Sequence, residues 1–358
     1  MKISFVNHTF LSGSGPDRVI LELSKRLATR HDTRIFACKW EGRGVSPAPC
    51  AHPFGFPFPL PSPRLLRELN KFDVVNIHFY PFCMYAPLLK SSVVLTFHGW
   101  TDVPETETPS ILWASREVAM NLLKIPAKKC PLIISVSRYL AEKIRNVSKT
   151  VVIPNGVDLS TYRPGEDRGY VLFVGRLVWY KGVHELIQII AGMGMDLHII
   201  GRGPELARLK GLAKNLGIED RVKFLGTLPE HKLVEEYRNC SFLASASKWE
   251  GFGMPFLEAN ACAKPVIGYN RAAIPERIVH RYNGFLANNF VELKKYMHLL
   301  EEDESLRKEM GVKGRKVAEK HDWNLIAARY EKIFELVHRH NLRRFHEDDY
   351  LHQLQGNV

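Results

Sequence analysis

The stretch YVLFVGRLVWYKG, residues 170–182, decides the fold class of this 358-residue chain. It opens with an apolar run, residues 170–174, that is long enough for one buried strand and ends at Gly175. A helical pattern follows Gly182. A strand that passes through a glycine turn into a helix is typical of a βα unit in a parallel sheet. The stretch therefore predicts an α/β protein.

The same alternation continues on both sides of this stretch. Toward the N-terminus the sequence predicts a helix over residues 16–29 and strands over residues 2–6, 33–37, 73–77, 92–97, 132–136 and 150–153. Toward the C-terminus it predicts strands over residues 197–200, 221–225, 242–244 and 265–267, followed by helices from residue 290 to about 339. Prolines crowd residues 46–63, which predicts an irregular loop there.

A turn-rich segment, residues 154–165, separates the two series of strands. The chain is also longer than one hydrophobic core usually serves. We therefore predict two doubly wound domains, with a ligand cleft between them at the carboxyl ends of the strands. The tail after Arg344 has no periodicity and is predicted to fray.

Composition and charge narrow the class of protein. Six cysteines form no C-x-x-C pair, which predicts reduced, mostly buried thiols in a cytoplasmic protein and no zinc site. No apolar run approaches the roughly 20 residues of a membrane span. Residues 1–150 hold 20 Lys and Arg against 11 Asp and Glu, so they carry +9 of the net +12. This excess fits an anionic membrane surface, a phosphate-bearing acceptor or a solubilising surface. No base-reading motif favours a nucleic acid.

Three strand-to-helix turns could bind phosphates. The first, GSGPDR at residues 13–18, resembles a dinucleotide fingerprint but has Arg18 in place of the third glycine. Gly15 still permits close approach of a ligand to a helix N-terminus. The second, GRGP at residues 201–204, either binds phosphate or is a tight turn before a helix. In the third, Arg176 and Lys181 either clamp a diphosphate or are two solvated cations.

A pair of glutamates supports a ligand site. The stretch KWEGFGMPFLE, residues 248–258, places Glu250 on a glycine-rich turn and Glu258 about one turn into the helix predicted over residues 255–262. A hydrolase acid/base pair must face each other across a bond at about 5–10 Å, which this arrangement does not suggest. The two carboxylates suit separate tasks, such as accepting hydrogen bonds from ligand hydroxyls.

The ordered set of these motifs resembles the retaining GT-B glycosyltransferases of family four, also called the glycosyltransferase group 1 family. The resemblance is dense over residues 151–287 and thinner before residue 150. It rests on residues 153–158, 174–177 with 181–182, 200–204, 222–226, 250–258, 274–276 and 283–284, and in the first half on residues 13–18, 97–99 and 135–140. It implies two Rossmann-like domains facing each other across a cleft. It divides the chain into residues 1–157 on the acceptor side, 158–320 on the nucleotide-sugar side, a helix over 321–340 that packs back toward the first domain, and a tail over 341–358.

The resemblance also implies roles for individual residues. Arg176 and Lys181 would neutralise the donor diphosphate, in place of a metal ion. His98 would lie beside the sugar near the reacting carbon, although a packed histidine is the alternative. Glu258 would accept hydrogen bonds from the donor ribose. The remaining implied donor contacts are Glu250 with Phe252, Gly253 and Met254 against the sugar, Gly15, Gly201 and Gly203 at the phosphates, and Leu228 near the base. The segment YNRAA, residues 269–273, lacks the family's usual glycines, which leaves the sugar unspecified.

The implied activity is retaining, metal-independent transfer of a hexose-type sugar from a nucleotide-diphosphate donor, most simply a UDP- or GDP-sugar, to an acceptor hydroxyl in polysaccharide or glycolipid biosynthesis. No separate cofactor is expected. The alternatives are a sugar-nucleotide epimerase and a nucleotide-sugar-binding protein without transfer activity. Two segments mix apolar and basic residues, 63–72 and 118–129. They predict a lipid-linked or membrane-proximal acceptor and peripheral attachment to the inner face of a membrane. The alternative is that their leucines face the core.

Overall fold

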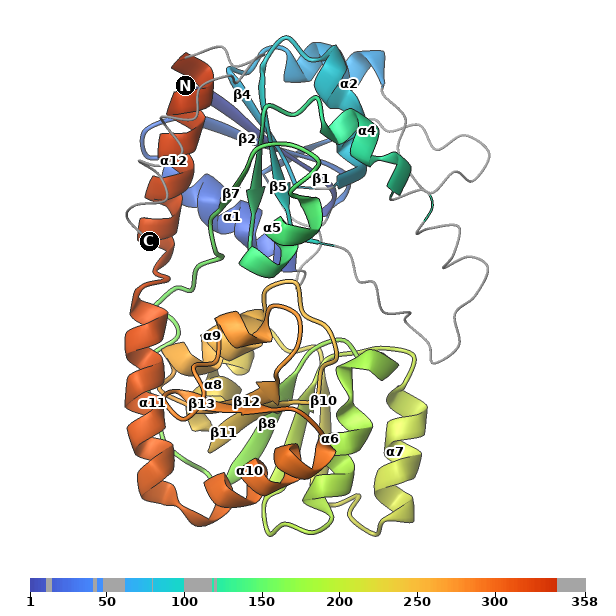
Figure 1. Ribbon diagram of the computed structural model, residues 1–358, viewed down its shortest axis with the longest axis vertical. Helices are drawn as coiled ribbons and strands as arrows, with labels where there is room; N and C mark the ends of the chain where they lie inside the picture. The colour runs from blue at the N-terminus through green and yellow to red at the C-terminus, as the bar shows by residue number, and fades with distance from the viewer. Residues whose placement is uncertain are drawn as a thin grey trace. The chain divides into compact units, whose positions relative to one another are not determined.

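The structure, a computed structural model, describes residues 1–10, 15–40, 44–47, 62–78, 80–99, 118 and 121–339. The chain folds into two compact units. The first unit contains Met1–Trp100, Ile111–Gly156 and Trp323–Val358, and the second contains Thr101–Ser110 and Val157–Asp322. Each unit is built on its own parallel sheet, and the elements of both are labelled in Figure 1.

The first unit has a seven-stranded sheet in the order β3-β2-β1-β4-β5-β6-β7. All of its neighbouring strands are parallel. Its strands are β1 (Lys2–Phe10), β2 (Asp32–Trp40), β3 (Val45–Pro47), β4 (Val74–Ile77), β5 (Ser92–Phe97), β6 (Leu132–Ser135) and β7 (Thr150–Val152). Its helices are α1 (Gly15–Leu27), α2 (Pro63–Leu69), the 3₁₀ segment η2 (Tyr80–Leu88), α4 (Lys124–Ala127), α5 (Arg138–Ile144) and α12 (Trp323–Arg339).

Helices α1 and α12 close the core of the first unit. In α1, Val19, Ile20, Leu23 and Leu27 are buried on one stripe, as their spacing predicts. Helix α12 packs against α1, β4 and β5. Its buried residues, which join the core of the β1–β7 sheet, include Trp323, Ile326, Tyr330, Ile333, Phe334 and Val337.

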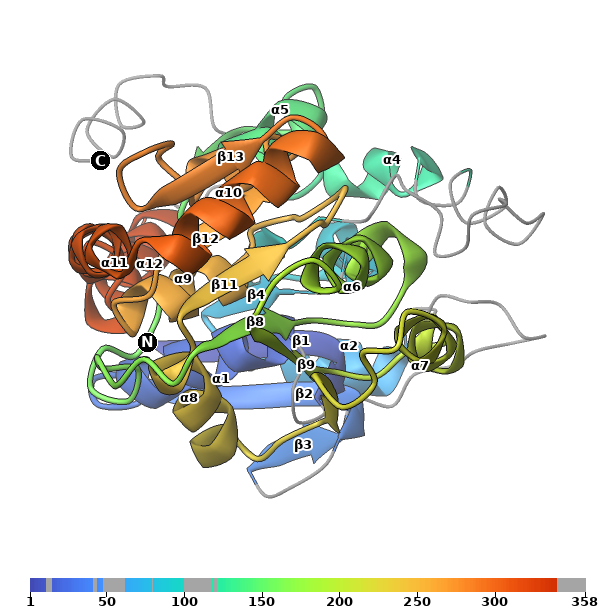
Figure 2. The same ribbon diagram turned by 90° about the horizontal axis from the view of Figure 1, so that it is seen from below.

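The second unit has a six-stranded parallel sheet in the order β10-β9-β8-β11-β12-β13. Helices α6, α7 and α10 lie on one face of this sheet and α8, α9 and α11 on the other (Figure 2). The strands are β8 (Tyr170–Val174), β9 (Asp196–Ile200), β10 (Val222–Gly226), β11 (Phe242–Ser245), β12 (Val266–Tyr269) and β13 (Gly284–Ala287). The helices are η3 (Trp179–Lys181), α6 (Val183–Ile190), α7 (Leu206–Asn215), α8 (Glu230–Asn239), α9 (Met254–Ala261), η4 (Ile274–Glu276), α10 (Phe290–Glu302) and α11 (Glu304–Glu319).

The predicted α/β class and the two Rossmann-like sheets are confirmed. The sequence prediction omitted β13, and it assigned an irregular loop to residues 46 and 47, which belong to β3. Both are short strands, and β3 pairs with the sheet on one side only. The tail from residue 341 lies outside the described residues.

The prediction of six reduced thiols is wrong for Cys38, which is disulfide-bonded. The spacing of cysteines along a chain does not show which of them folding brings within bonding distance. Cys83, Cys130, Cys240 and Cys262 are free and buried, as expected.

Candidate active site

The carboxyl ends of the parallel strands gather the predicted donor-binding residues of the second unit. Strand β8 lies between β9 and β11, so the strand order reverses between β8 and β11. Doubly wound sheets bind ligands at such a reversal. Arg176 and Lys181 follow β8, and Glu250 follows β11. The predicted glycine turn at residues 201–204 follows the neighbouring strand β9.

The turn after β8 is held against the segment after β11. Gly182 has a left-handed backbone, with φ of 66°, and a Cβ atom there would lie 2.3 Å from the carbonyl oxygen of Ala246. Only glycine fits this conformation and this approach. The backbone N–H of Lys248 donates to the carbonyl of Tyr180 at 2.8 Å. These contacts fix the position of Lys181 relative to the turn that carries Glu250.

Lys181 and Glu250 form an ion pair. The Lys181 Nζ lies 2.6 Å from the Glu250 Oε1, and the two side chains are only 13% and 15% exposed. An ion pair this far from water is less screened than a surface pair. Arg176, by contrast, is exposed. The structure therefore places one predicted phosphate-binding cation in a pair with the predicted sugar-binding carboxylate, an arrangement that the sequence analysis did not anticipate.

The two glycines after β9 let two turns pack together. A Cβ atom at Gly201, whose φ is 138°, would lie 1.9 Å from the carbonyl oxygen of Gly175. A Cβ atom at Gly203 would lie 2.2 Å from the carbonyl oxygen of Leu177. Close packing against the turn after β8 thus accounts for both glycines. Helix α7 begins at Leu206, two residues after Pro204.

Glu258 is buried on α9, one turn after the residue where that helix begins. Its side chain is 4% exposed, and its Oε2 accepts a hydrogen bond from the Tyr237 hydroxyl at 2.6 Å. Gly253 is the N-cap of the helix, with φ of 88°. Met254 is the first helical residue. Tyr237 lies on α8 and was not predicted, because in the sequence it looks like any core aromatic residue.

Arg277 is a second residue that the sequence analysis missed. Its guanidinium lies 4.3 Å from the centre of the Phe252 ring and donates a hydrogen bond to the His321 Nε2 at 2.8 Å. A cation over an aromatic face is a stabilising contact. Arg277 therefore supports the turn that contains Phe252. Leu228, predicted to lie near the base, is half-buried between β10 and α8.

In the first unit, His98 belongs to a chain of polar side chains that the sequence analysis did not connect. It follows β5, and its Nε2 lies 2.9 Å from the Nδ1 of His78, which follows β4. The Nε2 of His78 lies 2.6 Å from the Oδ1 of the buried Asn76. The two imidazoles stack, with centroids 5.1 Å apart. Burial lowers the pKa of His98 to about 4, and it lowers the pKa of His78 as well. The sequence did carry a signal for these hydrogen-bonded side chains, because Asn76 and His78 are polar residues within the apolar stretch DVVNIH, residues 73–78.

Gly15 is the first residue of α1, and a Cβ atom there would meet open space. Packing therefore does not require glycine at this position, whereas it does at Gly201. In the first turn of the helix, the buried Asp17 accepts a hydrogen bond from the Asn7 side chain at 2.8 Å. Residues 13 and 14 of the predicted phosphate turn lie outside the described residues.

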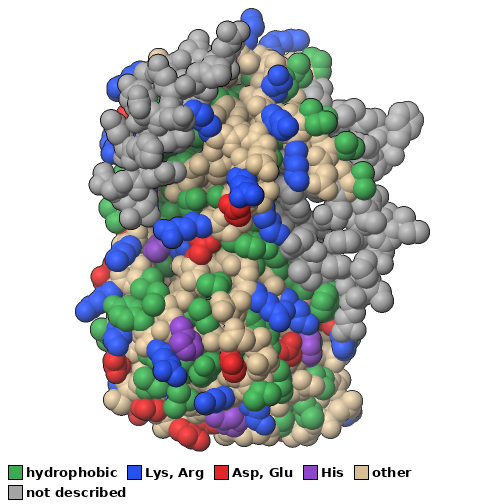
Figure 3. All heavy atoms as spheres, in the orientation of Figure 1, with side chains coloured by type: hydrophobic (Ala, Val, Ile, Leu, Met, Phe, Trp, Pro, Cys, Tyr) green, Lys and Arg blue, Asp and Glu red, His purple; other side chains and the backbone are tan. Residues whose placement is uncertain are grey.

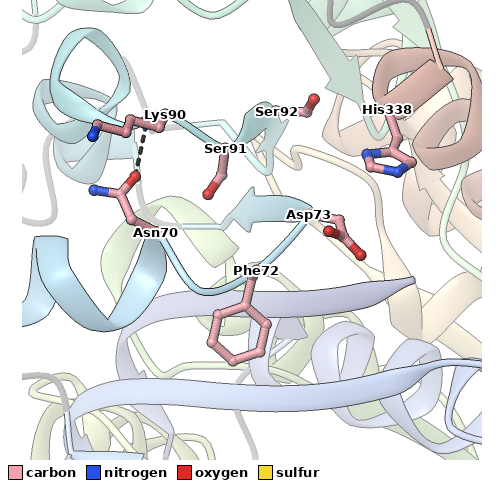
Figure 4. A pocket seen from close by; sticks show the side chains of 7 residues that line it. All are labelled: Asn70, Phe72, Asp73, Lys90, Ser91, Ser92 and His338. Atoms are coloured by element: carbon pink, nitrogen blue, oxygen red, sulfur yellow. Dashed lines mark hydrogen bonds between the residues drawn. The ribbon is translucent and has the colours of Figure 1, made fainter.

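A hollow of about 300 Å³ in the first unit lies away from these residues. Figure 4 shows its lining. It sits where β4 and β5 begin, the opposite edge of the sheet from His78 and His98. Several of its polar groups already bond within the protein: the Lys90 backbone N–H donates to the Asn70 Oδ1 at 2.7 Å, and the Ser91 hydroxyl donates to the Leu69 carbonyl at 3.1 Å. We assign no ligand to it.

Neither a metal-binding cluster nor a membrane-spanning helix is found in the described part of the chain. Residues 1–10, 15–40, 44–47, 62–78, 80–99, 118 and 121–339 contain no cluster of three or more His, Cys, Asp or Glu side chains that could hold a metal ion. Over the same residues, the helices are too short or too polar to cross a membrane.

The fold and these turns define a GT-B glycosyltransferase, and comparison with known proteins agrees. Residues 160–317 match the family model "Glycosyl transferases group 1", and residues 13–161 match "Glycosyltransferase Family 4". Together the matches span most of both units. The chain belongs to the group 1 glycosyltransferases.

Individual relatives and solved structures are consistent with this family. An uncharacterized glycosyltransferase of Methanocaldococcus jannaschii is 29% identical over 279 residues, 75% of this chain and 76% of that protein. A GDP-mannose-dependent alpha-(1-6)-phosphatidylinositol monomannoside mannosyltransferase of Mycobacterium tuberculosis is 25% identical over 304 residues, 72% of this chain and 77% of that protein. The structure of Anabaena HepE in complex with UDP-glucose superposes with a TM-score of 0.77 at 20% identity, covering 94% of this chain and 99% of that one. The similarity to HepE, at 20% sequence identity, is a similarity of fold.

Proposed function

We propose that this glycosyltransferase moves a hexose-type sugar from a nucleotide-diphosphate donor, a UDP- or GDP-sugar, to an acceptor hydroxyl with retention of anomeric configuration. The observation that carries the proposal is the meeting of the turns after β8 and β11, where Lys181 and Glu250 pair at the reversal of strand order. The mannosyltransferase relative uses GDP-mannose, and HepE binds UDP-glucose. The glycosyltransferase relatives favour transfer over an epimerase or a binding protein without activity.

The proposed chemistry is mainly electrostatic. When the sugar–phosphate bond breaks, negative charge develops on the diphosphate and positive charge on the sugar. Arg176 and Lys181 stabilise the first charge, and such preorganised stabilisation is usually the largest contribution to catalysis. The carboxylate of Glu250 lies on the sugar side and favours the second. The acceptor hydroxyl loses its proton to the departing phosphate on the same face, which retains the configuration.

Metal independence follows from this assignment. The two cations supply the charge that a divalent metal ion supplies elsewhere. We expect transfer from the preferred donor to proceed at an unchanged rate in EDTA, measured as release of UDP or GDP in a panel of UDP- and GDP-sugars with a glycan or lipid-linked acceptor. Bound donor should also raise the Tm, because a ligand at 100 times its Kd stabilises a protein by about 2.7 kcal/mol. Loss of transfer in EDTA that Mn²⁺ or Mg²⁺ restores would contradict the role of the cations.

The acceptor is proposed to be lipid-linked or membrane-proximal. One of the two segments predicted to touch a membrane, residues 63–72, does not support this. Leu65 and Leu69 of α2 and Phe72 after the helix are buried. The other segment, residues 118–129, supports a membrane-proximal acceptor. Leu122 and Ile125 are 62% and 67% exposed.

Apolar and basic residues of this second segment, together with Leu88 and Lys90 at the end of η2 and just after it, make up what we call the α4 patch. Its apolar members, all exposed, are Leu88, Val118, Leu122 and Ile125, and its cations are the exposed Lys90, Lys128 and Lys129 and the half-buried Lys124. Helix α4 contacts η2, and residues 80–92 and 121–130 contain no Asp or Glu. Figure 3 shows hydrophobic and basic side chains together in the region of α4. Apolar side chains beside cations suit the headgroup layer of an anionic membrane.

The α4 patch makes liposome binding testable. We expect co-sedimentation with liposomes that contain anionic lipid, and loss of binding in Ile125→Glu by about tenfold or more, because each nearby charge contributes about 1 kcal/mol and an apolar contact is also removed. High salt should weaken the binding. Val291→Glu is a matched control, since Val291 is equally exposed but lies on α10 of the second unit. If the wild type fails to bind at low salt, a soluble oligosaccharide acceptor becomes the proposal.

A further inference from the structure

The donors and acceptors can be assigned one by one along the chain of side chains formed by the buried Asn76 and His78 and the half-buried His98. The Asn76 Nδ2 lies 3.0 Å from the carbonyl oxygen of Val94. A carbonyl can only accept, so the atom facing it must be the amide nitrogen. The Oδ1 of Asn76 therefore faces the Nε2 of His78 at 2.6 Å. An amide oxygen only accepts, so the Nε2 of His78 carries a proton.

The position of the proton on His78 determines the position of the proton on His98. Burial lowers the pKa of His78 well below its usual value, so the ring is neutral and its Nδ1 is an acceptor. The atom 2.9 Å from that Nδ1 is the Nε2 of His98, which must then donate. A neutral His98 with its proton on Nε2 has an unprotonated Nδ1, which can only accept a hydrogen bond.

We infer that His78 is a positioning residue that fixes His98 in the Nε2-protonated tautomer, so that the Nδ1 of His98 accepts a hydrogen bond from a hydroxyl of the donor sugar. This inference rests on the proposed function for the presence of His98 in the sugar site. It excludes His98 as a proton donor to the substrate through Nδ1. It also selects donors with a hydroxyl, rather than a hydrogen-bond acceptor, at the position that His98 contacts.

The surroundings of His78 favour a fixed ring. His78 is 4% exposed and Asn76 is fully buried. The Nδ2 of Asn76 also donates to the hydroxyl of Thr96 at 2.9 Å. Both the nitrogen and the oxygen of this amide therefore have partners. The ring of Phe5 packs on the His78 ring, with centroids 5.9 Å apart. Rotation of His78 would leave buried polar atoms of Asn76 without their partner, which is costly.

The tautomer of His98 can be measured in the wild-type protein, with Asn76 and His78 unchanged. In protein labelled with ¹⁵N-histidine, long-range ¹H–¹⁵N correlation spectra distinguish the two neutral tautomers, and loss of a signal in His98→Gln identifies His98. We expect His98 to be neutral and protonated on Nε2 at pH 7. A charged ring, or a proton on Nδ1, would overturn the inference, whatever the enzymatic activity.

Two variants of His78 test the consequence for transfer. His78→Phe keeps a ring against Phe5 but removes the acceptor, and we expect the tautomer preference of His98 to be lost and kcat to fall about tenfold with little change in the KM for the donor. His78→Asn places an amide oxygen near the position of Nδ1 and should recover most of kcat. Wild-type kcat in a folded His78→Phe, with the tautomer unchanged, would also overturn the inference. If His98→Gln transfers sugar at the wild-type rate, the proposed placement of His98 fails instead.

Discussion

Replacing Arg176 or Lys181 with alanine is expected to weaken binding of UDP or GDP by about 1.5–3 kcal/mol, while binding of uridine or guanosine stays nearly unchanged. This is the contribution of one hydrogen bond that involves a charged group. The proposed contact is with the diphosphate, so a ligand without phosphates does not sense the loss. Isothermal titration of the diphosphate and the nucleoside on each variant measures the difference directly.

The two variants differ in their effect on the free protein. Lys181 pairs with Glu250 at 2.6 Å, so Lys181→Ala leaves a poorly exposed carboxylate without its partner, whereas Arg176 is exposed. Lys181→Ala should therefore also lower the Tm, and Glu250→Gln in the same chain should restore part of it. Lys223→Ala is the matched control, because Lys223 is a cation of the same unit that pairs with Asp196 on the surface. Equal losses for diphosphate and nucleoside would show that neither cation binds phosphate.

The Lys181–Glu250 pair shows what sequence reasoning could reach at this site. Each residue was identified from its position after a strand, because parallel strands bring their carboxyl ends to one edge of a sheet. Their mutual pairing was not predicted, because it depends on the approach of the turn after β8 to Ala246. Such an approach is set by backbone conformation over several residues and has no one-residue signal except Gly182.

Burial was the other limit of sequence reasoning. Residues 63–72 and 118–129 have nearly the same mixture of apolar and basic residues, yet Leu65 is fully buried and Ile125 is 67% exposed. Composition describes both segments equally well. The difference comes from tertiary packing, because α2 spans two helical turns with Leu65 and Leu69 on one stripe, whereas α4 is a single turn. A single turn cannot turn all of its apolar residues toward the core.

The strand pattern, by contrast, could be read reliably. Residues 170–174 are apolar throughout, and residues 92–97 are apolar except for Ser92 and Thr96, as expected for strands covered on both faces. Strands β8 and β5 occupy these positions within one residue. Strand β13, which was missed, has the sequence GFLA after a turn and pairs only with β12. Short edge strands carry too few residues for a periodic signal.

Glu258→Ala is expected to reduce kcat/KM for the nucleotide-sugar donor by about 100- to 1000-fold, the largest effect among the site variants. An ionised carboxylate has about four acceptor positions, so one carboxylate can accept hydrogen bonds from both ribose hydroxyls. Each charged hydrogen bond contributes about 1.5–3 kcal/mol. Loss of two therefore exceeds the loss of one cation–phosphate contact. Steady-state rates at low donor concentration measure the ratio.

The same substitution also disturbs the protein itself, and the design must separate the two effects. The Tyr237 hydroxyl is buried and loses its partner in Glu258→Ala, which costs about 1–3 kcal/mol of stability. Tyr237→Phe removes that hydrogen bond but leaves the carboxylate, so it should alter kcat/KM much less than Glu258→Ala does.

A donor analogue that lacks a ribose hydroxyl completes the test as a double-mutant cycle. With the wild type, the 2′-deoxy or 3′-deoxy donor should react about tenfold or more slowly than the parent donor, because one charged hydrogen bond is missing. With Glu258→Ala the two donors should react at similar rates, because the carboxylate that distinguishes them is gone. The resulting coupling energy belongs to the contact between Glu258 and the ribose, and changes in stability cancel from it. A full deoxy penalty that persists in Glu258→Ala would place the ribose elsewhere and leave Glu258 with a structural role beside Tyr237.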